Sequence, residues 1–416
     1  MIRAARNIVA TYRDAFGGLP AITWLLCFAA FVNRCGSMVL PLLSLYLLAK
    51  FGYTAGEAGE VVAFYGMGAV FGSVLGGKLA DRLGCVRVQI VTLAGAGCWM
   101  FLMAQITAAW LLAPATFVLG VINDAFRPGS ITAVATSVGP ELRRKALSLN
   151  RLMMNAGWAV GPTVGGNLVE HFDYSVMFWA DGGTCLLAAA FLFVFLRGFT
   201  PRTATPSDGD ASKAIAAAAH LRGPFRDLHF LWLMFVNFVV ITAFMQYFTT
   251  GTRVLKQDYG YPESTIFWLI AINPLLITLT EMPIVHTLRR HAALPIVALG
   301  SLVIGAGFLL YLLPLGATGV ILALAVITIG EVLQMALLGS YINDYAPERR
   351  RGAYNGAYGM SFSLALVAAP AVGGWLYDGA GARVLWTCCA IAGLLGAIGF
   401  LASHRKRREH HSLGPT

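Results

Sequence analysis

Seven ionisable side chains interrupt long apolar stretches of this 416-residue chain, and they are its first candidates for chemistry. They are Arg34, Asp124, Arg127, Arg151, Asp181, Glu281 and Glu331. On insertion scales, a charged side chain at the centre of a membrane-spanning helix costs about 2.5–3.5 kcal/mol, so each is a functional candidate. An arginine in such a place can bind an anionic group, and a carboxylate can bind a cation or carry a proton.

Asp124 and Arg127 are three residues apart, which puts them on one face of a helix. Such a pair can serve a substrate or a proton, or it can be a permanent structural ion pair. Gln246 and Gln334 also lie inside apolar stretches and are candidate polar neighbours of a binding site. The structural alternative for both is a hydrogen bond between helices.

The elements that carry these residues are predicted to be membrane helices. The chain is 57% hydrophobic and only 12% charged, about half the charged fraction of a soluble domain. About 20 apolar residues span a bilayer, and the alternation of a membrane β-barrel is missing. We therefore predict an all-α integral membrane protein with twelve spans, at 21–49, 57–79, 87–107, 110–137, 145–169, 174–197, 229–252, 263–287, 293–313, 317–344, 352–376 and 383–403.

The distribution of Lys and Arg predicts the orientation of these helices. Of the 30 basic residues, three lie inside spans, four lie in alternate loops, and 23 lie on the other side. Because cytoplasmic loops carry the excess of Lys and Arg, both termini are expected to be cytoplasmic. The same distribution explains the net charge of +10 without nucleic acid as a partner.

The spans fall into two groups of six. Residues 21–197 form the predicted N-terminal domain and 229–403 the C-terminal domain, joined by a linker at 198–228 that begins with Pro, Ser, Thr, Asp and Gly. A cytoplasmic segment at 1–20 precedes them, and a basic cytoplasmic tail at 404–416 follows. The first apolar stretch is too long for a cleaved signal peptide.

The two halves repeat each other at an offset of 207–208 residues. PELRRKALSLN at 140–150 is echoed by PERRRGAYNGA at 347–357, and GPTVGGNL at 161–168 by APAVGGWL at 369–376. Glu331 lies 207 positions after Asp124, so we expect it at the same depth in the second half. A buried carboxylate with no cation nearby in sequence suits reversible protonation near neutral pH, which makes Glu331 our strongest candidate for a proton carrier.

Residues 77–84 read GKLADRLG and lie in the short loop between the second and third spans. This sequence resembles the signature loop of the major facilitator superfamily, G-x-x-x-D-R-x-G, although Cys85 and Val86 replace two of the basic residues that usually follow. The resemblance extends to the number of spans, the central linker and the repeat. It implies two pseudo-symmetric six-helix domains and alternating access, with Asp81 and Arg82 latching the cytoplasmic side.

A second resemblance lies in the fifth span, where glycines and a proline follow a fixed spacing. It is similar to a motif of the family's proton-coupled multidrug and organic-compound antiporters, and it comprises Gly157, Gly161, Pro162, Gly165 and Gly166. The earlier glycine of that motif is Ser148 here, and the fourth-span arginine of drug antiporters is replaced by Thr116. The structural alternative is close helix packing without any bearing on the direction of transport.

The resemblance also implies neighbours for the buried charges. In the family the first and fourth spans line the cavity of the first half, so Arg34 is expected to join Asp124 and Arg127 there. This cluster would bind an anionic or zwitterionic group, or carry a proton on Asp124. The fifth and eighth spans face each other, which predicts an ion pair between Arg151 and Glu281 that closes the cytoplasmic side. Asp181 lies in the peripheral sixth span, where a structural partner is expected.

Two functions follow from these features. The first is proton-coupled antiport that exports small organic compounds, and the alternative is proton-coupled import of a charged nutrient such as a peptide, carboxylate or metal chelate. No nucleotide-binding loop and no enzyme motif is present, so we predict neither an enzyme nor a receptor. We expect no cofactor and no resident metal. The seven cysteines have no metal-ligand spacing. The protein is expected to act as a monomer in a bacterial inner membrane, with a small molecule and protons as partners.

Overall fold

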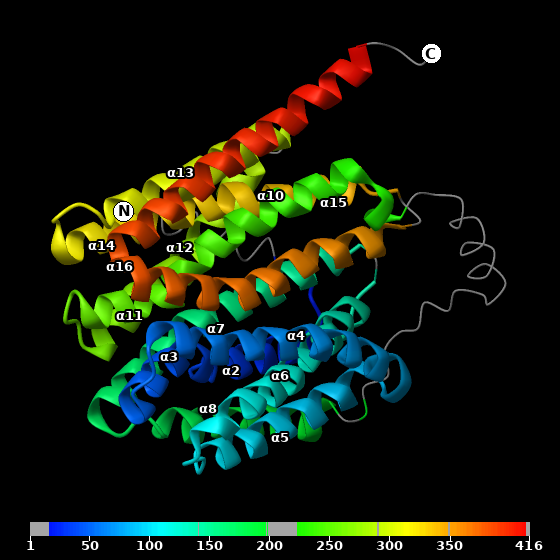
Figure 1. The fold of residues 1–416 in the computed structure, drawn as a ribbon. Helices are drawn as coiled ribbons and strands as arrows, with labels where there is room; N and C mark the ends of the chain where they lie inside the picture. The colour runs from blue at the N-terminus through cyan, green and yellow to red at the C-terminus, as the bar shows by residue number, and fades with distance from the viewer. Residues whose placement is uncertain are drawn as a thin grey trace, which may run out of the picture. The chain divides into compact units, whose positions relative to one another are not determined.

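The computed structural model describes residues 16–139, 141–196, 198, 223–288, 291–347 and 350–412. Most of the predicted linker, the first fifteen residues and the last four lie outside these ranges. The described residues form helices and turns without a β-strand, as predicted (Figure 1). They form two compact units, comprising residues 1–39 with 68–204, and 40–67 with 205–416.

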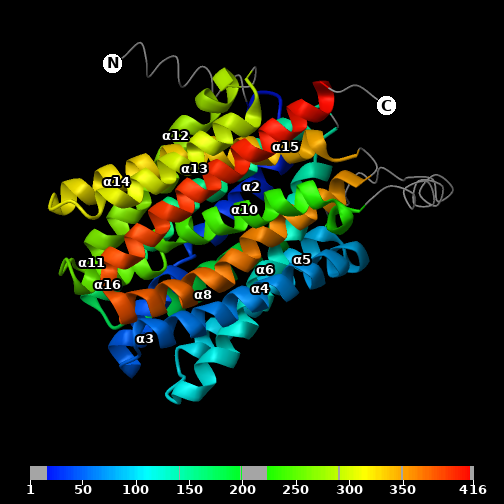
Figure 2. The same cartoon turned by 45° about the horizontal axis from the view of Figure 1, so that its top comes forward.

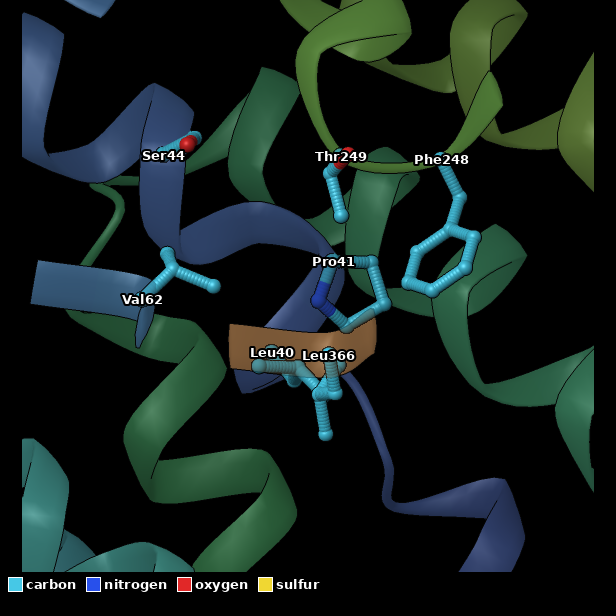
Figure 3. Close-up of a pocket in the computed structure, with 7 residues that line it drawn as sticks. All are labelled: Leu40, Pro41, Ser44, Val62, Phe248, Thr249 and Leu366. Carbon is cyan, nitrogen blue, oxygen red and sulfur yellow. The ribbon is translucent and has the colours of Figure 1, made fainter. Parts of the chain in front are cut away.

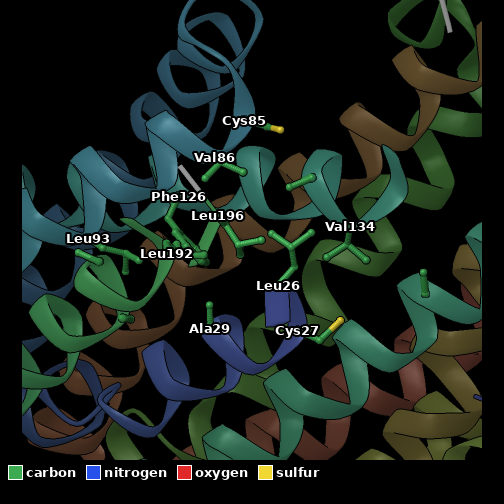
Figure 4. Packing of buried hydrophobic residues seen from close by; sticks show 14 of the residues in the cluster. Leu26, Cys27, Ala29, Cys85, Val86, Leu93, Phe126, Val134, Leu192 and Leu196 are labelled. Carbon is green, nitrogen blue, oxygen red and sulfur yellow. The ribbon is translucent and has the colours of Figure 1, made fainter. Parts of the chain in front are cut away.

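The first unit contains the helices of the N-terminal half. They are α2 (Ala21–Cys35), the second part of α4 (Ala55–Leu83), α5 (Cys85–Met103), the short η1 (Ala109–Leu111), α6 (Leu112–Thr136), α7 (Arg143–His171) and α8 (Val176–Leu196). Their core is built from small and branched side chains of α2, α5, α6 and α8, among them Leu26, Leu93, Phe126 and Leu192 (Figure 4). Small side chains allow close approach of helix backbones, which is how membrane helices associate.

The second unit contains the helices of the C-terminal half and takes in residues 40–67, which precede it by far in sequence. Its elements are α3 (Val39–Phe51) with the first part of α4, η2 (Pro224–Arg226), α10 (Leu228–Phe244), η3 (Met245–Tyr247), α11 (Thr250–Gln257), α12 (Glu263–Leu288), α13 (Ala293–Leu310), α14 (Gly316–Glu331), η4 (Val332–Ala336), α15 (Leu337–Tyr345) and α16 (Arg351–Ser412). The long α16 runs from orange to red in Figures 1 and 2.

Ten helical segments of the described chain are long and apolar enough to cross a membrane. One of them, Ala353–Arg405, is 53 residues long and contains Gly381 in a non-helical conformation, where the sequence predicts the end of one span and the start of another. The 29-residue α7 is not among the ten, because polar residues lower its hydropathy. Twelve spans result only if α7 is counted and α16 is divided, so that number stays a prediction.

Three of the predicted spans are interrupted where the sequence predicts continuous helices. The first is broken at 36–38 between α2 and α3, the seventh passes through the 3-10 segment η3, and the tenth through the π-helical segment η4. The breaks in the first and seventh spans are separated by about the repeat offset, so the repeat extends to the irregular backbone. Hydropathy reports apolar length and not helix continuity, which is why it does not predict these breaks.

Candidate functional site

In the first unit, the structure brings together the basic residues that the sequence singles out. Arg127 of α6 lies close enough to both Arg34 of α2 and Asp124 for their charges to interact. Arg34 and Asp124 are partly exposed, and Arg127 is exposed although it lies near the middle of its span. A lipid-facing arginine at that depth would be costly, so we expect this side chain to face a polar space and not the lipid.

Close contacts with glycine fix the position of Arg34. A Cβ atom on Gly157 of α7 would lie 2.5 Å from the Cβ of Arg34, and one on Gly161 would lie 2.8 Å from its carbonyl oxygen. The glycines of the fifth-span motif therefore allow α7 to pack directly against the end of α2. Pro162, Gly165 and Gly166 follow within the same helix. This is the structural role that the sequence offers as the alternative for the motif.

A second glycine stripe holds the helix that carries Asp124 and Arg127. Cβ atoms on Gly68, Gly72 and Gly76 of α4 would lie 2.1–2.3 Å from carbonyl oxygens of α6, too close to be tolerated. The four-residue spacing thus fits the backbone of α4 against that of α6. It places the acidic and basic side chains of α6 on a rigidly packed helix.

Asp181 of α8 has the structural partner that the sequence leads us to expect. Its Oδ2 accepts hydrogen bonds from the backbone N–H groups of Met38 and Val39, each at 3.2 Å, where the chain re-enters a helix after its break. The carboxylate therefore caps the N-terminus of α3. Asp181 is 4% exposed and lies within electrostatic range of Arg34. It connects the break in the first span to the basic cluster.

In the second unit, Glu331 lies in a hydrogen-bonded network made by three spans. The Nδ2 of Asn273 donates to the Glu331 Oε2 at 2.6 Å and to the Thr328 hydroxyl at 3.0 Å, and the Tyr247 hydroxyl donates to the Asn273 Oδ1 at 3.1 Å. Glu331 is partly exposed, whereas Asn273 and Tyr247 are buried. The arrangement leaves part of the Glu331 side chain exposed and holds the carboxylate through the Asn273 amide.

The two glutamines bond neighbouring helices of the second unit to each other. The Gln246 amide donates to the Ala369 carbonyl at 2.7 Å, and the Gln334 amide donates to the Asn237 Oδ1 at 2.8 Å. Both side chains are at most 3% exposed. These contacts correspond to the structural alternative, and a direct role in substrate binding stays a prediction.

The expected cytoplasmic gate residues are divided between the units. Arg151 is exposed on α7 in the first unit, and Glu281 is partly exposed on α12 in the second. Arg82 is exposed at the end of α4, while the side chain of Asp81 lies outside the described part of the chain. Their predicted roles therefore stay predictions.

A small pocket of the second unit lies where α3, α4, α16 and the residues after η3 meet (Figure 3). Its volume is about 10 Å³, enough for one water molecule. Its lining comprises Leu40, Pro41, Ser44, Val62, Phe248, Thr249 and Leu366. It is too small for a substrate, so these segments are packed almost without a gap.

Sequence reasoning alone does not assign Asn273, Tyr247 and Thr328 to the Glu331 site. Asn273 and Tyr247 come from other spans, and only the fold brings them to Glu331, whereas Thr328 precedes Glu331 by three residues in α14 and shares its helix face. One signal was available in the sequence. Asn273 directly precedes Pro274 within an apolar helix, and a polar residue beside a helix-interior proline marks an irregular position.

Comparison with known proteins agrees with this architecture. The family model of the Major Facilitator Superfamily matches residues 26–365 and 252–416. The chain is 25% identical to the uncharacterized MFS-type transporter YqjV of Bacillus subtilis, covering 92% of this chain and 93% of that protein. It is 22% identical to a Na(+), Li(+), K(+)/H(+) antiporter of Planococcus maritimus, covering 82% and 85%. It is also 22% identical to the multidrug resistance protein MdtH of Photorhabdus laumondii, covering 89% and 90%.

Solved structures give the same fold. A crystal structure of the peptide transporter POT in complex with sulfate is similar with a TM-score of 0.75, covering 94% of this chain and 96% of that one at 17% identity. At that identity the likeness concerns the fold alone. Together with the apolar helices and the internal repeat, these matches show that this multi-pass membrane protein is a transporter and not an enzyme, and that it belongs to the Major Facilitator Superfamily.

Proposed function

We propose that the protein is a proton-coupled secondary active transporter that works by alternating access, with Glu331 as the proton carrier. The observation that carries this proposal is the partly exposed Glu331 carboxylate, held by a 2.6 Å hydrogen bond inside a membrane span. A partly exposed carboxylate can exchange protons. Because the same carboxylate is hydrogen-bonded to a neighbouring span, its change of protonation can alter the contact between the helices. No basic residue lies on α14 or in the adjoining η4 segment to fix its charge.

The energy for transport then comes from an ion gradient. One proton moving through about 100 mV supplies about 2.3 kcal/mol. At about 1.4 kcal/mol per tenfold change, this supports a substrate gradient of roughly 50-fold. Protons are favoured over sodium because the Asn273 amide donates to the Glu331 Oε2 at 2.6 Å, whereas a sodium ion binds through oxygen ligands.

The basic cluster of the first unit is proposed to bind the substrate. Arg34 and Arg127 lie within electrostatic range of each other, and such a pair of guanidinium groups can bind an anionic or zwitterionic substrate group. The Arg34 Nε is buried without a hydrogen-bond partner among the described residues, which leaves a donor for a ligand. Asp124 is the second candidate for the coupling proton.

For the direction of transport, we propose antiport that exports small organic compounds. Relatives named as a multidrug resistance protein and as a cation/proton antiporter support this direction. A groove of about 230 Å³ in the second unit is lined by aromatic and methionine side chains of α10 and α16, among them Phe235, Phe238 and Met360. Such side chains adapt to varied apolar compounds.

The second candidate is import of a charged nutrient, which the two arginines favour. The likeness in fold to a peptide transporter solved with bound sulfate is consistent with it.

Under either direction we propose that both termini are cytoplasmic and that the protein acts as a monomer in the bacterial inner membrane. Asp81 and Arg82 are proposed to latch the cytoplasmic side, together with an Arg151–Glu281 ion pair.

The test is a proteoliposome assay with an imposed pH gradient and a panel of organic cations, organic acids and peptides. Uptake together with inward-moving protons means symport, and counterflow means antiport. We expect Glu331→Gln to abolish coupling to the gradient while exchange of substrate between the two sides persists. Transport of a substrate that ignores the pH gradient in the wild-type protein would contradict proton coupling in both directions.

A further inference from the structure

Irregular backbone segments from three spans meet at Glu331. Glu331 is the last residue of α14, and the π-helical η4 begins directly after it. Tyr247 ends the 3-10 segment η3, and Asn273 precedes Pro274 inside α12. Segments of π- and 3-10-helix are costly and concentrate at functional sites. The side chains around Glu331 are therefore brought together by local departures from the regular helix.

The hydrogen bonds around Asn273 allow only one orientation of its amide group. The Tyr247 hydroxyl donates to the Oδ1 at 3.1 Å. The Thr328 hydroxyl donates its proton to the Leu324 carbonyl at 2.7 Å, so Thr328 can only accept from Asn273. A flipped amide would turn its oxygen toward two acceptors, Thr328 and Glu331. Tyr247 and Thr328 thus hold the Nδ2 of Asn273 toward the carboxylate.

Water cannot replace this donor on the protein side of the site. Asn273 is 4% exposed and Tyr247 is 8% exposed, whereas Glu331 is partly exposed. A donor fixed against a carboxylate stabilises the ionised form. Removing a donor from such a buried position weakens the stabilisation of the ionised carboxylate.

Three tyrosines of the described chain lie at or beside this network. Tyr247 faces it from η3, Tyr311 lies within electrostatic range of Tyr247, and Tyr358 of α16 donates to the carbonyl of Met335 in η4. The neighbouring α13 has no charged residue. Glu263 and Glu281 of α12 lie ten and eight residues from Asn273, about 12–15 Å along the helix axis.

We propose that Asn273, held by Tyr247 and Thr328, is the positioning residue that sets the pH at which Glu331 takes up and releases its proton. The inference rests on the proposed role of Glu331 as proton carrier. When Asn273 donates, the ionised carboxylate is favoured, and when the three spans move apart, the carboxylate loses its donor and takes up a proton. The hydrogen bond thereby links the movement of the spans to protonation.

The test is an infrared difference titration of the full-length chain in proteoliposomes, which follows the carboxylic acid C=O stretch without any substrate. Glu331→Gln identifies the signal of Glu331 by removing it. We expect Asn273→Ala to move the midpoint of that signal upward by about one pH unit. Tyr247→Phe should move it in the same direction by less, because the amide keeps its contact but loses its orientation.

Asn237→Ala is the matched control. Asn237 is also a fully buried asparagine of the second unit, and it bonds Gln334 and Ser361 in place of Glu331. In the Asn237→Ala variant, the midpoint of the Glu331 signal should equal that of the wild-type protein. An unchanged midpoint in both Asn273→Ala and Tyr247→Phe, with the Glu331 signal assigned, overturns the positioning role and leaves the carrier intact. If Glu331→Gln removes no titrating signal, the proposed carrier role fails as well.

Discussion

Asp181 accepts hydrogen bonds from two backbone N–H groups at the interruption of the first span, and it lies near Arg34. A Cβ atom on Gly36 would lie 1.8 Å from the Thr184 hydroxyl, so only glycine fits between this break and α8. One carboxylate and one glycine thus hold the irregular backbone that orients a candidate substrate-binding arginine. Neither role can be read from a single sequence, because both partners come from another span.

Glu331 shows what sequence can supply at the scale of residues. The repeat offset from Asp124 selects it, and the structure places it partly exposed at the junction with a π-helical segment. The sequence does not supply Asn273 or Tyr247, since contacts between distant spans have no local signature. A charged residue inside an apolar stretch can be picked out from the sequence because charges are rare in membrane spans. A buried amide cannot be picked out in this way.

Asp227 gives a prediction about pH at the scale of one residue. Burial would raise its pKa, but hydrogen bonds from the Phe230 N–H and from the hydroxyls of Tyr345 and Tyr354 outweigh this, and its pKa lies below the ordinary value. Because the folded state lowers the pKa, the stabilisation is full above the unfolded value near 4 and is lost as pH falls through the folded one.

We therefore expect Asp227→Ala to lower the stability of the folded protein near pH 7 by about 1 kcal/mol or more, since it removes the cap of α10. Between about pH 5 and pH 3 the variant should lose less stability than the wild-type protein. Thermal unfolding in detergent, followed over that pH range, measures both effects. Asp344→Ala, at an exposed site near the end of α15, should behave as the wild type does.

At the scale of elements, the first part of α4 is packed tightly onto α16. Cβ atoms on Gly59 and Gly374 would lie 2.1 and 2.4 Å from carbonyl oxygens of Pro370 and Ala55. The Asp378 carboxylate accepts from the backbone N–H groups of Ala55 and Gly56, at 3.1 and 2.5 Å, and so caps α4. Under the proposed orientation this is the extracytoplasmic end, and we expect it to separate when that side opens.

Gly59→Val should push α4 away from α16 and favour the state that is open to the outside. The readout is labelling of Ser44→Cys, in the small pocket beside α4, by a maleimide that does not cross membranes, after subtracting the labelling of native cysteines such as the exposed Cys98. We expect faster labelling from outside in the Gly59→Val variant. Gly77→Val is the control, because a Cβ at Gly77 of the same helix meets no atom within 4 Å.

Most of the predicted helix bounds agree with the structure to within a few residues, because apolar length fixes where a membrane helix can begin and end. The interruptions in the first, seventh and tenth spans were not predictable in the same way. The sequence around these breaks, near Gly36, Ser37 and Gln246, is as apolar as that of the flanking helices. The first break is capped from another span, by Asp181 of α8, and a contact of this kind depends on the tertiary fold.

At the scale of the whole molecule, the repeat predicts two halves, and the structure forms two compact units. The domain bounds at 21–197 and 229–403 stay a prediction. Residues 40–67 belong to the N-terminal half in sequence, yet they pack within the second unit. The chain leaves the first unit at Val39, directly after the break that Asp181 caps.

The proposed Arg151–Glu281 ion pair is the prediction that concerns both halves. Arg151→Glu and Glu281→Arg would each place two like charges where the fifth and eighth spans are expected to approach, and would favour the state open to the cytoplasm. The double variant restores opposite charges. We expect each single variant to slow exchange of a transported substrate in proteoliposomes by about 10-fold, and the double variant to recover most of the rate.

The test depends on whether the two substitutions affect the exchange rate independently, and not on how much each single variant slows it. If the two positions do not interact, the effects of the single variants add, and the double variant is slower than either of them. Additive losses would remove the Arg151–Glu281 pair from the gate while leaving the roles of Glu331 and Arg34 untouched, since those residues lie elsewhere in each half. A recovered rate would connect the halves through one named pair of side chains.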